Sequence, residues 1–225
     1  MGLIYTSGRK SGIKTYSFYY AIIKFMKKYN ELKKLPFQGS LAGISEKTIS
    51  IHHDKLYGGY VKKWQEIGER LKTADNTEAN ASFSDLRELK LEESFVANAI
   101  ILHEAYFDVL GGKGEAEGEI IKAIEKDFGS FEKWLEDFKA LGLCSRGWTI
   151  LAYDFNEGKL RNFLVDAHNL CGVWGTSPIL VLDMYEHAYF IDFGSDKKSY
   201  IEAFFKNLNW KIINQKFQKI TSKKD

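Results

Sequence analysis

The residues of this chain best suited to chemistry are a small set of histidines and one aspartate. The sequence of 225 residues contains five histidines: His52, His53, His103, His168 and His187. Asp183 directly follows the wholly apolar run 179–182, and His187 comes four residues later. A carboxylate buried beside several imidazoles is unfavourable unless a cation neutralises the group. Three imidazoles and one carboxylate suit Fe, Mn or Zn, so the set indicates a mononuclear metal site.

The spacing alone leaves a simpler interpretation open. His52 lies on the apolar stripe of a helix predicted for residues 45–71, and His103 lies on that of a second helix predicted for 85–110. A single histidine on such a stripe is more often a hydrogen-bonded core residue than a metal ligand. The D-x-x-x-H spacing of Asp183 and His187 also arises by chance. The residues by themselves therefore permit either a metal site or an ordinary core.

The two predicted helices are the elements that would position two of these histidines. Gly58-Gly59 predicts a kink in the first helix. Ser84 is the expected N-cap of the second helix, and Gly111-Gly112 are expected to end it. The small, polar loop 73–82 between them is short, so the pair is expected to form an antiparallel helical hairpin.

The second half of the chain changes its periodicity and predicts a sheet. Asn156-Glu-Gly158 separates two apolar strands and indicates a hairpin. The expected elements are helices over 116–127 and 131–143 (N-cap Ser130), strands over 148–155, 160–166 and 179–182, and a closing helix over 200–208 before a fraying Lys-rich end. The predicted class is α+β: an N-terminal antiparallel helical hairpin (35–112) followed by an α/β domain with a small three-stranded antiparallel sheet (113–225).

Composition excludes several classes of function. Lys and Arg total 32 against 30 Asp and Glu, which leaves no broad electrostatic footprint for nucleic acid. The apolar runs are far shorter than the roughly 20 residues that a membrane-spanning helix needs. Residues 1–34 hold eight Lys/Arg and one Glu, and we expect a flexible basic extension there; the alternative hypothesis is that Met26 is the true translation start. Without a secretory signal, Cys144 and Cys171 are expected to be reduced thiols in a cytoplasmic protein, a disulfide between them being the alternative.

Local sequence around these residues resembles that of iron/manganese superoxide dismutases. The stretch 44–61, with its I-H-H run, is similar to the N-terminal signature of that family. Residues 127–133 and 145–148 resemble its middle segments. The run 183–189, DMYEHAY, matches the D-x-[WY]-E-H-A-[YF] signature, and Asn209-Trp210 resembles the closing motif. The resemblance extends from about Leu35 to Trp210.

The resemblance implies an activity and a role for each residue. The expected activity is disproportionation of superoxide to O₂ and hydrogen peroxide by redox cycling of one Fe or Mn ion per subunit, with iron slightly favoured. His53 would be structural. The implied site comprises the metal ligands His52, His103, Asp183 and His187, the outer-sphere tyrosine Tyr60, and an aromatic shell of Phe107, Trp148 and Tyr185.

His168 is the informative variant within this resemblance. Many family members place a glutamine at this position, or on the second helix, to hydrogen-bond the metal-bound solvent. Ala99 occupies the helix position here. The chain thus resembles the branch that uses a histidine instead, the alternative being that His168 is only a loop residue.

The residues at the expected channel and subunit interface depart from the family pattern. Leu56 and Phe190 replace a histidine and a tyrosine that meet across the dimer interface, and Tyr57 is a candidate source of the missing polarity. Asp196 stands where the family often has an arginine, which leaves Lys55 as the candidate attractor for an anionic substrate. Glu186 would pair with the ligand histidine of the other subunit, which implies a homodimer or tetramer.

Two other functions are compatible with the same residues. Two histidines and a carboxylate also serve non-haem iron oxygenases, although that interpretation leaves the third histidine unexplained. The altered channel residues would equally suit a metal-binding homologue with little turnover.

Overall fold

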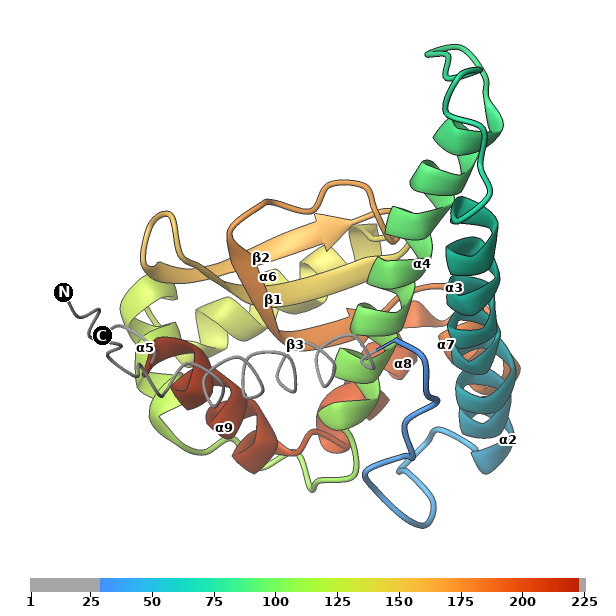
Figure 1. Ribbon diagram of the computed structural model, residues 1–225. Helices are drawn as coiled ribbons and strands as arrows, with labels where there is room; N and C mark the ends of the chain where they lie inside the picture. Colours follow the sequence, from blue (N-terminus) through green and yellow to red (C-terminus); the bar gives the residue numbers. More distant parts are fainter. Residues whose placement is uncertain (1–28, 223–225) are drawn as a thin grey trace, which may run out of the picture.

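The computed structural model describes residues 29–222. Residues 1–28 of the basic extension expected over 1–34, with the suggested start at Met26, lie outside the described residues. Its three strands form an antiparallel sheet in the order β2-β1-β3, and the α+β prediction is confirmed (Figure 1). The elements in chain order are α2 (Glu46–Ser50), η1 (Ile51–Tyr57), α3 (Gly58–Leu71), α4 (Asp85–Asp108), α5 (Glu119–Phe128), α6 (Phe131–Cys144), β1 (Trp148–Asp154), β2 (Lys159–Val165), β3 (Thr176–Asp183), α7 (Glu186–Phe193), α8 (Lys197–Lys206) and α9 (Trp210–Thr221).

The first two predicted helices form the expected antiparallel hairpin, whose tip extends well beyond the sheet (Figure 1). The Ser84 side chain caps α4 by accepting from the backbone N–H of Arg87. In place of the predicted kink at Gly58-Gly59, the helix widens before these glycines: η1 is a seven-residue π-helix that ends at Tyr57, with Gly58 as its C-cap. The Gly58 N–H donates to the carbonyl of His53, five residues earlier. Such wide turns are rare and occur often at functional sites.

The sheet brings the start of β1 beside the end of β3. Trp148 is the register partner of Asp183 on one side and of Val165 on the other. Strand β3 begins at Thr176, three residues earlier than predicted, and includes Pro178. An edge strand tolerates proline because its outer N–H groups have no partner strand. The register places a buried indole next to the one aspartate singled out in the sequence.

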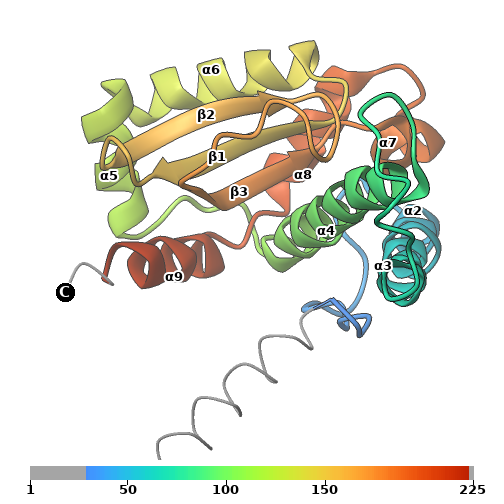
Figure 2. The ribbon, with the colours of Figure 1, turned by 45° about the horizontal axis from the view of Figure 1, so that its top comes forward.

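Helices cover both faces of this sheet. Helix α6 lies over one face, and α4 and α9 lie along the other (Figure 2). The predicted fraying of the Lys-rich end is wrong for residues 210–221, which form α9 because Trp210 and Ile213 are buried. Helix α7 was not anticipated, and α8 starts at Lys197 instead of Tyr200.

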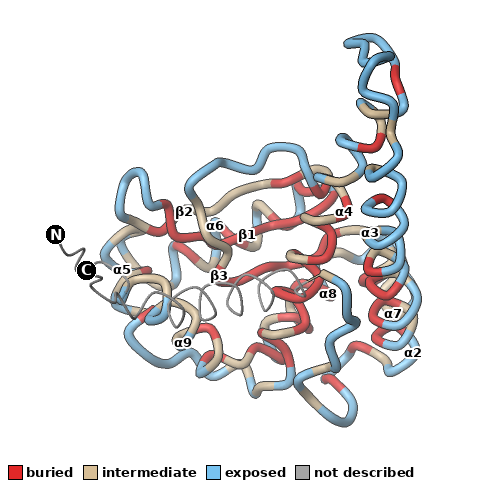
Figure 3. The backbone as a smooth tube through the Cα atoms, viewed as in Figure 1, coloured by how far each residue is buried: buried red, intermediate tan, exposed pale blue. Residues whose placement is uncertain are grey.

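Burial is concentrated where α4 passes the sheet, whereas the hairpin tip is exposed (Figure 3). None of the helices in the described part of the chain is long and apolar enough to cross a membrane.

Candidate metal centre

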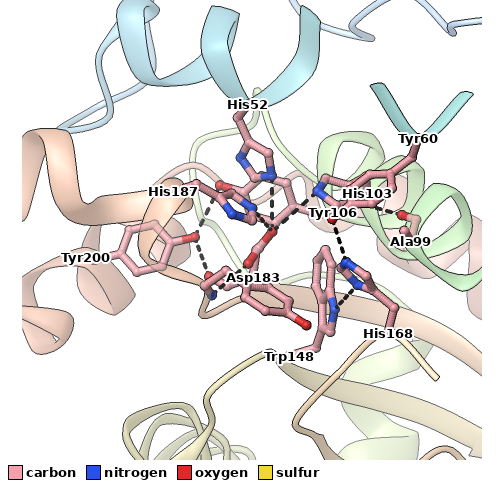
Figure 4. Close-up of polar contacts among 11 residues, drawn as sticks. His52, Tyr60, Ala99, His103, Tyr106, Trp148, His168, Asp183, His187 and Tyr200 are labelled. Atoms are coloured by element: carbon pink, nitrogen blue, oxygen red, sulfur yellow. Dashed lines mark hydrogen bonds and ion pairs between the residues drawn. The ribbon is translucent and has the colours of Figure 1, made fainter. Parts of the chain in front are cut away.

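Four side chains from four different elements converge at the centre of the molecule. His52 comes from η1, His103 from α4, Asp183 from the end of β3 and His187 from the first turn of α7. Their candidate ligand atoms all lie within 4.8 Å of one another. The Nε2 atoms of His52, His103 and His187 lie 3.1, 3.9 and 3.2 Å from Asp183 Oδ2 (Figure 4). The structure thus brings together the ligand set that the sequence suggested.

A hydrogen bond of His103 leaves the lone pair of its Nε2 atom facing the centre of this cluster. His103 Nδ1 donates to the carbonyl of Ala99 at 2.7 Å, so its Nε2 carries no proton. That Nε2 atom and both ring nitrogens of His52 are buried and lack a hydrogen-bond partner among residues 29–222. Buried polar atoms are rarely left unpaired, and lone pairs facing a carboxylate repel it unless a cation lies between them. The donor set therefore fits a metal ion, with N and O ligands suited to Fe or Mn.

The electrostatics favour an ionised Asp183 and neutral imidazoles at His52 and His103. Burial raises the pKa of Asp183, but neighbouring His187 and His52 outweigh it and hold that pKa well below its usual range. Burial lowers the pKa of His52 and lowers that of His103 still further. For His187, burial also lowers the pKa, but the Asp183 charge reverses the sign and the pKa is raised. An ionised carboxylate and neutral imidazoles are the protonation states that metal binding requires.

A hydrogen-bonded chain runs from Trp148 through His168 to Tyr60 beside this cluster (Figure 4). The Trp148 indole N–H donates to His168 Nδ1 at 3.0 Å, and His168 Nε2 lies 3.0 Å from Tyr60 Oη. Burial lowers the pKa of His168 to about 4, so the ring is neutral near pH 7. Because an indole only donates, the single proton of His168 must lie on Nε2, which donates to Tyr60 Oη. The Tyr60 O–H is thereby left free to donate elsewhere.

The predicted aromatic shell surrounds the four side chains. Ring centroids of Phe107 and His52 lie 4.9 Å apart, and those of Trp148 and His103 lie 5.0 Å apart. Tyr185 stacks on His187 at 5.4 Å with planes 11° apart. Rigid apolar rings limit the entry of water and restrict rotation of the imidazoles.

Comparison with known proteins identifies the family to which this geometry belongs. The sequence model described as iron/manganese superoxide dismutases, C-terminal domain, matches residues 116–216. An iron superoxide dismutase of Aquifex aeolicus is 43% identical over 185 residues, which cover 80% of this chain and 87% of the relative. The chain belongs to the iron/manganese superoxide dismutase family. Proteins of this family disproportionate superoxide with iron or manganese.

The relatives include enzymes named for each metal. An iron superoxide dismutase of Cupriavidus metallidurans is 41% identical over 193 residues, covering 83% of this chain and 95% of the relative. A manganese superoxide dismutase of Halobacterium salinarum is 34% identical over 192 residues, covering 84% of this chain and 94% of the relative. Membership of the dismutase family therefore does not select between the two metals.

The residues expected at the dismutase channel and interface lie nearer the surface. Lys55 and Glu186 are exposed, Leu56 is half-buried, and Phe190 is 55% exposed. The Asp196 side chain caps α8 by accepting from the Ser199 N–H at 3.0 Å.

The suggestion that Tyr57 supplies polarity to the channel is wrong. Tyr57 is buried, and its hydroxyl donates to Glu104 Oε1 at 3.0 Å. Glu104 is itself a residue that sequence reasoning missed. The available signal was a glutamate directly after His103 on the apolar stripe, where an ionisable group requires a partner.

Two buried tyrosines behind Asp183 were also missed. The Tyr200 hydroxyl donates to the Asp183 backbone carbonyl at 2.8 Å and lies 3.3 Å from the Tyr106 hydroxyl. The Tyr106 ring lies 5.1 Å from that of His52. Both positions have ordinary apolar-stripe spacing, so the pattern predicted core residues and not their hydrogen bonds.

Proposed function

We propose that the protein is a superoxide dismutase that binds one iron or manganese ion per subunit through His52, His103, Asp183 and His187. The observation that carries this proposal is the convergence of three imidazole nitrogens on Asp183 Oδ2, with the free Nε2 lone pair of His103 directed at that oxygen. The activity named for relatives at 41–43% identity supports it. Iron is our first choice of metal, since those two relatives are iron enzymes.

The bound ion supplies a one-electron couple that takes an electron from one superoxide and returns it to another. The protein must then provide two protons for each hydrogen peroxide that leaves. Burial raises the pKa of Tyr60, and the charge of Asp183 adds to the effect, so this hydroxyl stays protonated. Since His168 donates to its oxygen, Tyr60 can direct its own O–H toward the substrate position. Trp148 holds His168 in the tautomer that this arrangement needs.

Channel and assembly roles belong to the same proposal. The exposed ammonium of Lys55 would attract the superoxide anion, and Leu56 and Phe190 would pack together across a subunit interface. Glu186 would hydrogen-bond the ligand histidine of a second copy and orient it, giving a homodimer or a tetramer. We also propose residues 35–112 and 113–225 as the two domains.

We further propose a cytoplasmic location. Its support is that Cys144 and Cys171 are both free and exposed, as suits a reducing compartment.

The decisive experiment is superoxide decay per bound metal, on protein loaded separately with iron, manganese and zinc. Zinc can occupy N and O ligands but has no redox couple, so the zinc form is the matched inactive control. Turnover with iron or manganese, and none with zinc, supports the proposal and identifies the metal. Full occupancy with decay at the aqueous background would instead indicate a metal-binding homologue. Oxygen uptake that depends on an added 2-oxo acid would indicate the non-haem oxygenase class.

A further inference from the structure

The segment that precedes the helical hairpin crosses both helices that carry candidate ligands, and Lys33 makes the contact. Its backbone N–H donates to Tyr57 Oη at 3.2 Å, and its carbonyl accepts from His53 Nε2 at 2.7 Å. Its ammonium group donates to Glu104 Oε2. One residue is thereby bonded to η1 through its backbone and to α4 through its side chain.

The burial of Glu104 makes its contact with the Lys33 ammonium important for stability. Its side chain is only 5% exposed, and it directly follows His103 on α4. A buried carboxylate is destabilising unless a cation or hydrogen bonds compensate it, and removal of one partner leaves an uncompensated charge. Lys33 and the Tyr57 hydroxyl provide that compensation. Lys216, a second cation whose charge acts on Glu104, contacts Asp108 at 3.2 Å.

The same bonds act on the π-helix that presents His52. The two η1 residues held by Lys33, His53 and Tyr57, are four positions apart on this wide turn, and both are buried, as is His52. A π-turn is less favourable than an α-turn, so it persists where outside contacts stabilise it. The Tyr57 ring lies parallel to that of His103, with centroids 6.2 Å apart and planes 10° apart. The contacts of Lys33 therefore reach the neighbours of both histidines.

We propose that Lys33, Tyr57 and Glu104 form a clasp that positions His52 and His103, so that retention of the metal depends on the chain segment before the hairpin. The inference rests on the ligand set proposed above. The three are positioning residues, since they act on the metal through the two histidines. Outer partners of metal ligands commonly change metal affinity by about 10–100-fold when they are replaced.

The test compares Lys33→Met with Lys139→Met. Lys139 is the matched control because its ammonium also bonds a glutamate on another helix, Glu202, at 2.7 Å. Iron release from the loaded protein into excess chelator is measured, and we expect Lys33→Met to release iron about tenfold faster than wild type. Lys139→Met is expected to release it at the wild-type rate. Lys33→Arg keeps the cation and is expected to restore slow release.

A second readout separates positioning from general destabilisation. Tyr57→Phe keeps the ring against His103 and removes only the hydroxyl. In cobalt(II)-loaded protein, we expect the visible ligand-field spectrum to shift in Tyr57→Phe and Lys33→Met but not in Lys139→Met. Equal iron release from the Lys33→Met and Lys139→Met variants, or unshifted spectra, would overturn the clasp. Loaded protein that fails to consume superoxide would overturn the proposed function alone, because neither readout depends on turnover.

Discussion

Replacement of His168 by glutamine is expected to remove a defined part of the pH dependence of stability. The His168 side chain is 3% exposed, and its Nδ1 accepts from the Trp148 indole N–H. In a protonated ring, Nδ1 would carry a proton that faces this N–H, and the hydrogen bond would be lost. The folded state therefore disfavours the proton, and burial lowers the pKa from 6.5 to about 4. A glutamine can accept from Trp148 and donate to Tyr60 without titrating. His168→Gln thus keeps the hydrogen bonds and deletes the ionisation.

The sign and size of this pH dependence follow from the difference in proton binding between the folded and unfolded states. Between pH 6.5 and 4, His168 is protonated in the unfolded chain but stays neutral in the folded protein. Its contribution to the free energy of unfolding is therefore complete above pH 6.5 and is lost as the pH falls from 6.5 to 4. The complete window corresponds to about 3 kcal/mol, and the part lost between pH 7 and pH 5 is about 2 kcal/mol. Other ionisable groups are common to both proteins and cancel in the comparison.

The measurement is urea unfolding of the metal-free wild type and the His168→Gln variant at pH 8, 7 and 5. Wild type should lose about 2 kcal/mol more than the variant between pH 7 and 5. Between pH 8 and 7 the two proteins should change equally, which serves as the internal control. Equal losses down to pH 5 would refute the reasoning, because His168 would then titrate as an ordinary solvated loop residue.

Three further substitutions test other parts of the site. Asp183→Asn removes the only charged ligand and should weaken metal binding at least about 100-fold, measured as metal content after equilibrium dialysis; wild-type content would contradict the ligand assignment. Trp148→Phe keeps an aromatic ring beside His103 but removes the donor to His168 and leaves a cavity where the buried indole lay, so the free energy of unfolding should fall by at least about 1.5 kcal/mol, and an unchanged value would count against that bond. Glu186→Ala should lower both the association constant of the dimer, measured by sedimentation equilibrium, and the retention of metal, and no change in either would argue against the intersubunit role.

Much of the helical framework could be predicted from local sequence. Ser84 and Ser130 cap the helices that they were expected to cap, because a hydroxyl that accepts from the third N–H of a helix is a purely local interaction. The apolar stripe of α4 likewise predicted the burial of His103. The β1–β2 hairpin followed from its turn residues, which depend only on neighbours in the chain.

The missed elements are those that depend on distant contacts. Residues 210–221 read as a charged tail, yet they form a helix because Trp210 and Ile213 find apolar surface elsewhere in the fold. The π-helix could not be predicted because its sequence continues the apolar stripe of an ordinary α-helix. A contact from outside the helix, the hydrogen bond between His53 and the Lys33 carbonyl, stabilises the wide turn. Tertiary packing overrides the local secondary-structure propensity of a segment where the packing contributes more free energy than the propensity does.

For the site, the sequence by itself determined the chemical types: three imidazoles and a carboxylate within recognisable motifs, and His168 in place of an amide. Only the tertiary structure decided how they act. The antiparallel register places Trp148 beside Asp183. The hydrogen bond from His103 Nδ1 to the Ala99 carbonyl leaves Nε2 as the nitrogen without a proton. Lys33 and Glu104 are 71 residues apart, and only folding brings them together. Protonation states and pairings depend on desolvation and on neighbours distant in the chain, which no local pattern records.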